Sequence, residues 1–294
     1  MSPFPSSPGN VDEWILSPDY VGSAGPGSHP RGYRVIGTSD ILWQNTSDGS
    51  VDLWKMAGAT WNGSVGLGTH PGNGWQIAGS GDFNGDHTSD VLWFDAATGQ
   101  TDIWELANGQ WAASVSPGPH PLGYQIAGVG DFNNDGTKDV LWFNPSTGNV
   151  DEWKILNGQW AGSVNLGAHS GTGWQIAAIG NLAGPHTDDI LWFNSTTGQT
   201  DVWVMDHGVF ASNVSLGPHP TGYNVIGIGH TGSSATVLFQ SSSTGDIDEW
   251  VVGNGAWTRS IDLGVHPGAG WVVGGLGDFN GDHTTDLLWH NLLA

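Results

Sequence analysis

The sequence Asp-Phe-Asn-Gly-Asp-His-Thr-Ser-Asp at residues 82–90 decides the fold of this chain, because it recurs with small changes at residues 131–139 and 278–286. Each copy places oxygen-bearing side chains at positions 1, 3, 5 and 9 of a short loop and then continues into an apolar segment. Carboxylate and amide oxygens that converge from one turn are the ligands that Ca²⁺ prefers. The three loops therefore predict about three calcium ions with a structural role.

We expect the side chains at these four positions to bind the metal, with a backbone carbonyl at position 7 completing each set. The predicted ligands are Asp82, Asn84, Asp86, Asp90, Asp131, Asn133, Asp135, Asp139, Asp278, Asn280, Asp282 and Asp286. The alternative is an Asp- and Asn-rich β-turn without metal. Metal is favoured because closely packed carboxylates repel one another unless a cation neutralises them. An EF-hand is excluded, since no helical pattern flanks the loops and no Glu occupies position 12.

The loops belong to a longer repeat with three markers, each present six times at intervals of mostly about 50 residues. The first marker is the Trp of Val/Thr/Ile-Asp-x-Trp, as in Trp104 and Trp153. The second is an apolar-Leu-Trp segment after an Asp, with Phe239 in place of Trp in one copy. The third is Leu/Pro-Gly-x-His followed by Gly and an aromatic residue. A repeat of this length indicates a propeller or a solenoid.

One repeat shows how the strands are arranged. Residues 124–130, 140–144, 150–156 and 160–166 read as strands, and turn residues such as Asn157-Gly158 separate them. Four short antiparallel strands in about 50 residues are typical of a propeller blade. We expect the recurring Trp of Val-Asp-x-Trp to pack mainly between blades.

The two ends of the chain complement each other, since it begins with a third strand and stops after a second strand. We therefore predict an all-β fold in one domain over residues 1–294. It is a six-bladed β-propeller with four antiparallel strands per blade, closed by N- and C-terminal strands that share one blade. The predicted blades are residues 33–68, 75–118, 124–167, 174–217, 223–264, and 271–294 together with 9–28.

The His loops are the candidate ligand site. In the predicted blade they share one end with the turns between the second and third strands, opposite the cation loops. The candidate residues are His29, Tyr33, His70, Trp75, His120, Tyr124, His169, Trp174, His219, Tyr223, His266 and Trp271. His and aromatic residue are four positions apart in blades one, three and five and five apart in the others, which predicts two classes of loop.

Aromatic faces suit sugar rings, and imidazole, Asn and Asp can hydrogen-bond sugar hydroxyls. The alternative is that each His orders its own loop and each aromatic ring packs between blades. For a single His we favour this alternative, and for the whole face we favour ligand binding, because loops on a rigid scaffold often carry function.

The loops and the repeat length resemble the FG-GAP or VCBS-type calcium-binding propeller repeats, which are related to those of integrin α-subunit heads. The resemblance covers the whole chain and implies calcium at the first loop of each blade and an extracellular adhesive or ligand-binding role. Similar fungal propeller lectins bind sugars between blades. Residues 181–189 and 229–236 depart from the pattern, because most ligand positions have been lost. We expect no calcium there, and an unusual backbone conformation at His87 and His283.

Composition limits the partners. Six Lys and Arg oppose 28 Asp and Glu, for a net charge of −22, which argues against nucleic acid and anionic membranes. The chain has no Cys and no apolar run long enough for a transmembrane helix. The N-terminus does not read as a signal peptide, although we expect a secreted or cell-surface protein.

The predicted function is multivalent glycan binding by a calcium-stabilised lectin, with glycans or glycoconjugates on a cell surface as partners. The alternative is an integrin-like adhesion module that binds protein. An enzyme with its site at the central channel is a third interpretation. It has little support, since the sequence has no nucleophile motif and no carboxylate pair that stands apart from the repeat. We therefore predict no enzymatic activity.

Overall fold

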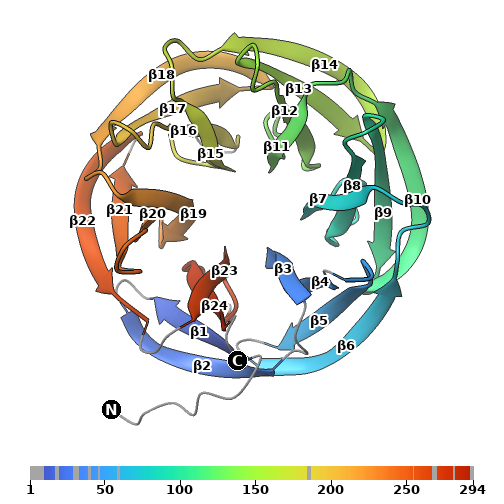
Figure 1. Ribbon diagram of the computed structural model, residues 1–294, viewed down its shortest axis with the longest axis horizontal. Helices are drawn as coiled ribbons and strands as arrows, with labels where there is room; N and C mark the ends of the chain where they lie inside the picture. The colour runs from blue at the N-terminus through green and yellow to red at the C-terminus, as the bar shows by residue number, and fades with distance from the viewer. Residues whose placement is uncertain are drawn as a thin grey trace.

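The computed structural model describes residues 10–16, 20–28, 33–38, 41–45, 47–57, 60–183, 187–253, 255–266, 270–280 and 282–291. For residues 10–16, 20–28, 33–38, 56–57 and 60 it describes the backbone alone. Strands dominate these residues, and they include no helix long and apolar enough to cross a membrane. Figure 1 shows four-stranded sheets arranged around one axis.

Five of these sheets are each built from four consecutive strands. Blade one contains β3 (Tyr33–Thr38), β4 (Ile41–Asn45), β5 (Val51–Ala57) and β6 (Thr60–Gly68). Blade two contains β7 (Trp75–Gly81), β8 (Asp90–Asp95), β9 (Gln100–Ala107) and β10 (Gln110–Pro119). Blade three contains β11 (Gln125–Gly130), β12 (Asp139–Phe143), β13 (Asn149–Leu156) and β14 (Gln159–Ala168). Blade four contains β15 (Gln175–Gly180), β16 (Asp189–Phe193), β17 (Gln199–Asp206) and β18 (Val209–Pro218). Blade five contains β19 (Tyr223–Thr231), β20 (Ser234–Ser241), β21 (Ile247–Gly253) and β22 (Ala256–Gly264).

A further sheet, the composite sheet, joins the two ends of the chain in the order β2-β1-β24-β23. It contains β1 (Asn10–Leu16), β2 (Tyr20–Ser28), β23 (Trp271–Gly277) and β24 (Asp286–Asn291). Residues 11–14 of β1 pair antiparallel with residues 287–290 of β24.

The prediction of a closed ring of six blades with one shared blade requires a correction. The structure supports five complete blades and a partial sixth sheet. In each complete blade a turn links the second strand to the third, as residues 144–149 link β12 to β13. Among the described residues of the composite sheet, no such turn links the two halves, and they are joined by the ladder between β1 and β24. Its N-terminal half is described by its backbone alone.

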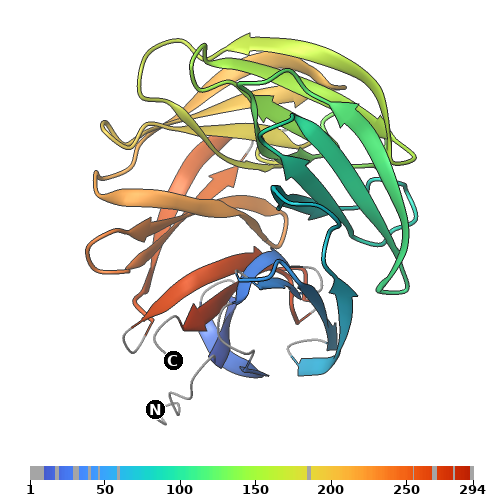
Figure 2. The same cartoon turned by 45° about the vertical axis from the view of Figure 1, so that its right-hand side comes forward.

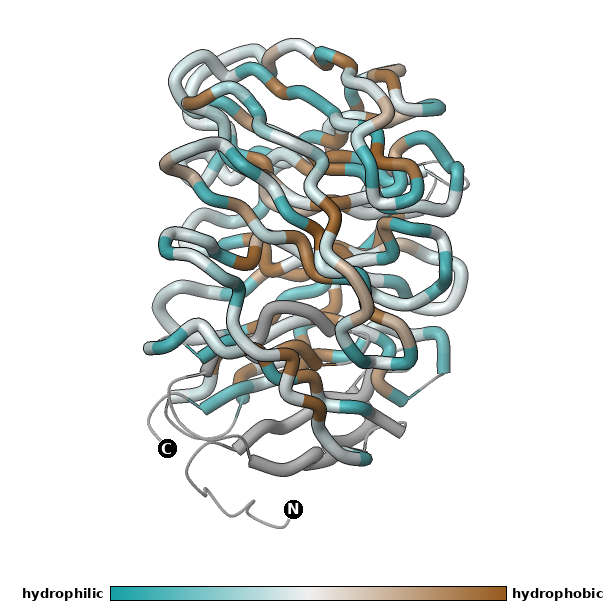
Figure 3. The backbone as a smooth tube through the Cα atoms, turned by 90° about the vertical axis from the view of Figure 1, so that its right-hand side faces the viewer, coloured by the Kyte–Doolittle hydropathy of each residue, from teal (hydrophilic) through white to brown (hydrophobic). Residues whose placement is uncertain are grey.

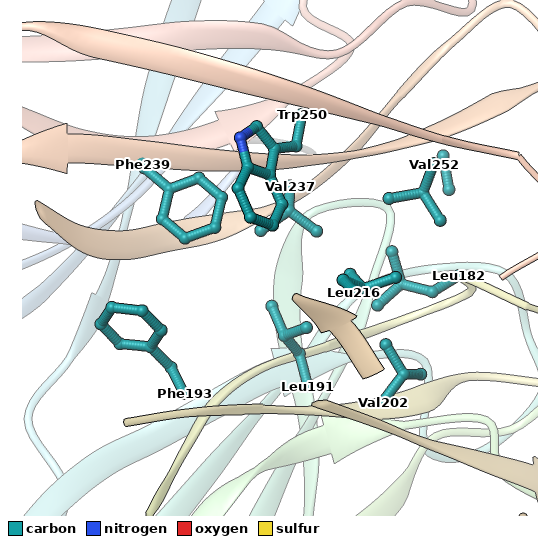
Figure 4. Close-up of a cluster of buried hydrophobic side chains, with 10 residues drawn as sticks. Leu182, Leu191, Phe193, Val202, Leu216, Val237, Phe239, Trp250 and Val252 are labelled. Carbon is teal, nitrogen blue, oxygen red and sulfur yellow. The ribbon is translucent and has the colours of Figure 1, made fainter. Parts of the chain in front are cut away.

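The core lies between neighbouring blades, because the second strand of each blade is buried on both faces. In β12, Val140 and Trp142 pack with residues of blade two, whereas Leu141 packs with residues of blade four. Successive side chains of a strand point to opposite faces, so one run of apolar residues contributes to two interfaces. Figure 3 shows the hydrophobic segments mostly in the middle of the molecule and the hydrophilic ones mostly at its edges. Figure 4 shows one interface, in which Leu182, Leu191 and Val202 of blade four face Val237, Phe239 and Trp250 of blade five.

Turn chemistry sets the short connections. Asn157 and Gly158 link β13 to β14 with φ of 51° and 72°, the pair of positive values that a type I′ hairpin requires. The first loop of blade two contacts blade three. Asp82 accepts a hydrogen bond through its carbonyl oxygen from the Lys138 amide at 2.7 Å, and the Phe83 carbonyl accepts one from the Gly158 amide at 2.9 Å.

Candidate functional site

In each predicted cation loop the first carboxylate holds the loop's own backbone. In blade two, Asp82 accepts hydrogen bonds from the amides of Gly85 at 2.6 Å and His87 at 2.8 Å. Asp86 accepts one from the Thr88 amide at 2.8 Å. The loops at 131–139 and 278–286 repeat this pattern around Asp131 and Asp278. These carboxylates therefore shape the loop in addition to any role as ligands.

The expected unusual backbone at position 6 is confirmed. His87 and His283 have φ of 66° and 65°, and Gly136 has φ of 89° at the same position of its loop. Positive φ is uncommon for a residue other than Gly. In these loops, the backbone amides of His87 and His283 donate hydrogen bonds to the first Asp of the loop. The backbone geometry of the loop is thus kept whether position 6 is Gly or His.

The Asp at position 9 is fully buried and bonded to the blade itself. In blade two, Asp90 accepts hydrogen bonds from the amides of Leu106 at 2.9 Å and Phe83 at 3.0 Å. Blade four has lost most of the other predicted ligands, yet Asp189 accepts hydrogen bonds from Met205, Leu182 and Ala183 in the same way. The residue at position 9 therefore has a structural role that does not depend on the rest of the metal-ligand pattern.

Burial makes the negative charge of these loops unfavourable. It raises the pKa of Asp90 to about 7, with further repulsion from Asp86 and Asp82. It also raises the pKa of Asp139 to about 7. The neighbouring Glu152 is completely buried, neither of its carboxylate oxygens has a hydrogen-bond partner, and burial raises its pKa to about 8. A cation in the loop of blade three would relieve this repulsion.

The donor set fits calcium in its chemistry, since Asp82, Asn84 and Asp86 offer hard oxygen ligands from one turn. Asp86 is exposed and the other two are partly exposed, so a cation can reach them. As placed, the described residues do not gather three or more acidic, His or Cys side chains around one point. Calcium at residues 82–90, 131–139 and 278–286 stays a prediction, as does its absence at 181–189 and 229–236.

Five of the six predicted His residues are described, and their rings lie inside the blades. His120, His219 and His266 are less than a tenth exposed, and the side chains of His70 and His169 are 7% and 6% exposed. His29 lies outside the described residues, and only the backbone of Tyr33 is described.

Each described ring sits between aromatic residues, and four of them also meet the Asp of Val/Thr/Ile-Asp-x-Trp. In blade two the Nε2 atom of His70 lies 2.9 Å from Asp102, and its Nδ1 atom lies 3.0 Å from the Pro71 carbonyl oxygen. The ring packs against Trp75, Trp93 and Trp104. The corresponding His–Asp pairs are His120–Asp151, His169–Asp201 and His219–Asp248.

The two predicted classes of loop differ in how the His ring lies. In blades two and four, His70 and His169 are nearly parallel to the Trp of the third strand, at 13° and 17°. In blades three and five, His120 and His219 are nearly parallel to the aromatic ring of the second strand, at 20° and 18°. One residue more or less between His and the aromatic residue thus changes which ring it stacks on.

A set of exposed aromatic residues on the outermost strands was not predicted from the sequence. One such side chain lies seven residues after the third-strand Trp of each complete blade, and all are between 42% and 52% exposed. They are Trp61, Trp111, Trp160, Phe210 and Trp257. Their regular spacing was a fourth repeat marker that could have identified them.

These side chains, here called the outer aromatics, continue the aromatic clusters to the surface. Trp160 meets Trp153 edge-on at a centroid distance of 6.4 Å, and Trp153 in turn contacts Trp142 at 5.1 Å. Trp257 and Phe210 make the same kind of contact in their blades. Buried rings thus support four of the outer aromatics, namely Trp61, Trp160, Phe210 and Trp257. All five leave about half their surface to solvent.

Residues 82–142 match the FG-GAP-like repeat family. This stretch runs from the loop of blade two to the second strand of blade three, so it contains the first two predicted cation loops. The family resemblance inferred from the sequence is therefore confirmed through this stretch. No curated protein matches the chain.

Solved structures are similar in fold at low sequence identity. A chain in the crystal structure of a nidogen/laminin complex has a TM-score of 0.56 and 8% identity, over 88% of this chain and 90% of that chain. A luciferin-regenerating enzyme has a TM-score of 0.49 and 11% identity, over 96% and 95%. A protein from Lactobacillus plantarum has a TM-score of 0.47 and 14% identity, over 84% and 75%. At such identities the first of these supports the fold alone, and the other two carry no further argument.

Proposed function

We propose that the protein is a calcium-stabilised lectin, without enzymatic activity, that binds glycans through its outer aromatics. The observation that carries this proposal is the presence of one half-exposed aromatic side chain at the same place in each of five blades. A flat apolar ring that is held rigidly at the surface suits the apolar face of a sugar. The buried His rings, in contrast, are enclosed by protein groups and leave little surface for a ligand.

Polar residues that could bind sugar hydroxyls occur on the same strands as the outer aromatics. In blade three, Gln159 and Ser163 are exposed and belong to β14, as Trp160 does. In blade two, the hydroxyl of Ser114 donates to the Asp102 carboxylate at 2.7 Å. Amide, hydroxyl and carboxylate groups offer the donors and acceptors that sugar hydroxyls require.

Repetition would supply affinity. A single ring with a few hydrogen bonds binds a sugar weakly, but several equivalent sites on one rigid body gain avidity on a surface that carries many glycans. Glycans or glycoconjugates on a cell surface are therefore the proposed partners, and a secreted or cell-surface location is part of the proposal. Calcium bound at Asp82, Asn84, Asp86 and the corresponding residues of the other two loops would brace the loops and reduce the net charge of −22.

The test is a glycan array with the purified protein in millimolar calcium and again after chelation. A combined Trp111→Ala, Trp160→Ala and Trp257→Ala variant should lose binding by roughly tenfold or more, because avidity falls with each site. The matched control replaces Leu122, Leu156 and Val265, which are 66%, 49% and 51% exposed, by Ala. Equal loss in both variants, or an array without binding by folded protein, would remove the lectin proposal.

The second candidate is an adhesion module that binds protein without sugar specificity. One observation favours it, namely a cavity of about 230 Å³ between blades one and two that lies outside the repeated pattern of the outer aromatics. A protein partner with one binding orientation would use such a cavity more readily than a repeated glycan would. An array without binding would leave this candidate as the proposed function.

A further inference from the structure

Most described interfaces between blades are filled by a side chain from the first loop of the preceding blade. Phe83 of blade two is fully buried between blades two and three. Phe132, Leu182 and Phe279 occupy the same place at the interfaces that follow their own loops. This side chain is here called the plug.

The sequence of blade one offers no apolar residue for a plug. Only Ser39 and Asp40 lie between β3 and β4 in the sequence, where blade two has residues 82–89. The apolar surface that a plug would cover therefore belongs to blade one on one side and blade two on the other.

A cavity of about 230 Å³ lies at this place. The lining is mixed. Its apolar part consists of Leu42 and Leu53 of blade one and Val91 and Leu106 of blade two, and its polar part consists of Ser80, His87, Thr88, Ser89, Asp90 and Gly109 of blade two. The counterparts of the four apolar residues one blade further along are Leu92, Ile103, Val140 and Ile155, which all belong to the cluster around Phe83. The apolar part of the cavity thus corresponds to the wall of a plug site.

The polar rim of the cavity also matches a plug site. At the filled interface, the amide of Gly158 donates to the carbonyl oxygen of Phe83. The counterpart of Gly158 is Gly109, which lines the cavity, and no hydrogen bond joins its amide to the described part of blade one. Lys55 lies beside this turn, with its ammonium group 3.0 Å from the carbonyl oxygen of Asn108.

We propose that this cavity binds a Phe side chain that a loop of a partner protein presents in place of the missing plug. The apolar part of the lining would contact the ring, and the volume is sufficient, since a cavity of about 150 Å³ already holds benzene. The Gly109 amide would donate to the carbonyl of the same residue, as Gly158 does to Phe83. Lys55 favours an acidic residue next to the Phe, as Asp82 precedes Phe83 in the chain's own plug.

The chain's own loop provides the probe. A capped peptide with the sequence of residues 81–85, Gly-Asp-Phe-Asn-Gly, is titrated into the full-length protein in millimolar calcium, with methyl NMR and calorimetry as readouts. We expect saturable shifts of the methyl groups of Leu42, Leu53 and Val91. The same peptide with Ala in place of Phe should bind at least about tenfold more weakly.

Two variants make the test specific. Leu53→Trp fills the cavity from its own wall and should abolish peptide binding, whereas Leu122→Trp at an exposed position should leave it unchanged. Should Leu53→Trp fail to fold, Leu53→Phe replaces it in the test. This variant fills the cavity only in part, and we expect it to bind the peptide more weakly than the unchanged protein does. The proposal is overturned if the peptide, at millimolar concentration, shifts no methyl resonance of Leu42, Leu53 or Val91. It is also overturned if toluene binds as tightly as the peptide, because such binding indicates a site for small apolar molecules. The result is independent of glycan binding.

Discussion

The interface between blades two and three and the interface between blades one and two have nearly the same apolar walls but different contents. In the former, Phe83 fills the space and its carbonyl is bonded to Gly158. In the latter, blade one contributes no plug, and a cavity of about 230 Å³ results. The comparison shows that an interface in this fold depends on a loop as well as on strands.

Removal of a plug should have the largest effect. Phe83→Ala would reproduce in blade two the empty space that blade one has naturally, and we expect it to lower the free energy of unfolding by about 3–5 kcal/mol. The measurement is urea unfolding in the presence of calcium. A loss below about 1 kcal/mol would show that plugs contribute little and that the cavity is not a missing-plug site.

A pH effect comes next, from the interface between blades three and four. Glu152 is the counterpart of Leu53 and is buried without a hydrogen-bond partner. Its folded-state pKa of about 8 lies above its ordinary value of 4.5. Between these two pH values, Glu152 holds a proton in the folded protein that it has released in the unfolded chain. Its contribution to stability is therefore fully present below about pH 4.5 and is lost as the pH rises toward 8.

The expected slope from this group is roughly 1 kcal/mol per pH unit. Urea unfolding in a chelator at several pH values from 5 to 8 measures it. Glu152→Gln removes the titrating group and should flatten its part of the slope, whereas Asp206→Asn on the exposed end of β17 serves as the control. A slope that is unchanged in Glu152→Gln would mean that the carboxyl group is not buried as described.

The smallest effect should come from added volume. Ile103→Phe enlarges a side chain beside Phe83 and should cost about 1–3 kcal/mol, as overpacking usually does. Leu53→Phe makes the same change at the wall of the cavity and should change stability by less than about 1 kcal/mol. Thermal unfolding of the two variants compares them directly. Equal losses would show that the cavity closes up around its own walls.

Local chemistry made much of the fold predictable. The alternation of apolar residues and the turn residues placed strands such as β12 and β13 within a residue or two of their observed bounds. Asn157-Gly158 was identified as a turn because that pair tolerates positive φ. The prediction of a closed six-bladed ring with one shared blade was wrong, since sequence complementarity of two ends does not supply the turn that joins the halves of a blade.

The candidate site was less predictable. His120 and Trp160 are both amphipathic residues in a repeat, and nothing in their own chemistry says that the first is 4% exposed and the second 49%. Burial of the His depends on three aromatic rings of its blade, namely Tyr124 just before β11, Trp142 of β12 and Trp153 of β13. Exposure of Trp160 depends on its position on β14, which is the outermost strand of its sheet.

The sequence by itself determined the repeat, the strands, the turns and the loop backbone at residues such as His87, because φ preferences and side-chain alternation act between neighbours in the chain. Only the tertiary structure decided which side chains are enclosed, which are presented to solvent, and where the missing plug leaves a cavity. The physical reason is that burial is a property of the space between blades, and that space is shaped by residues about 50 positions apart in the chain.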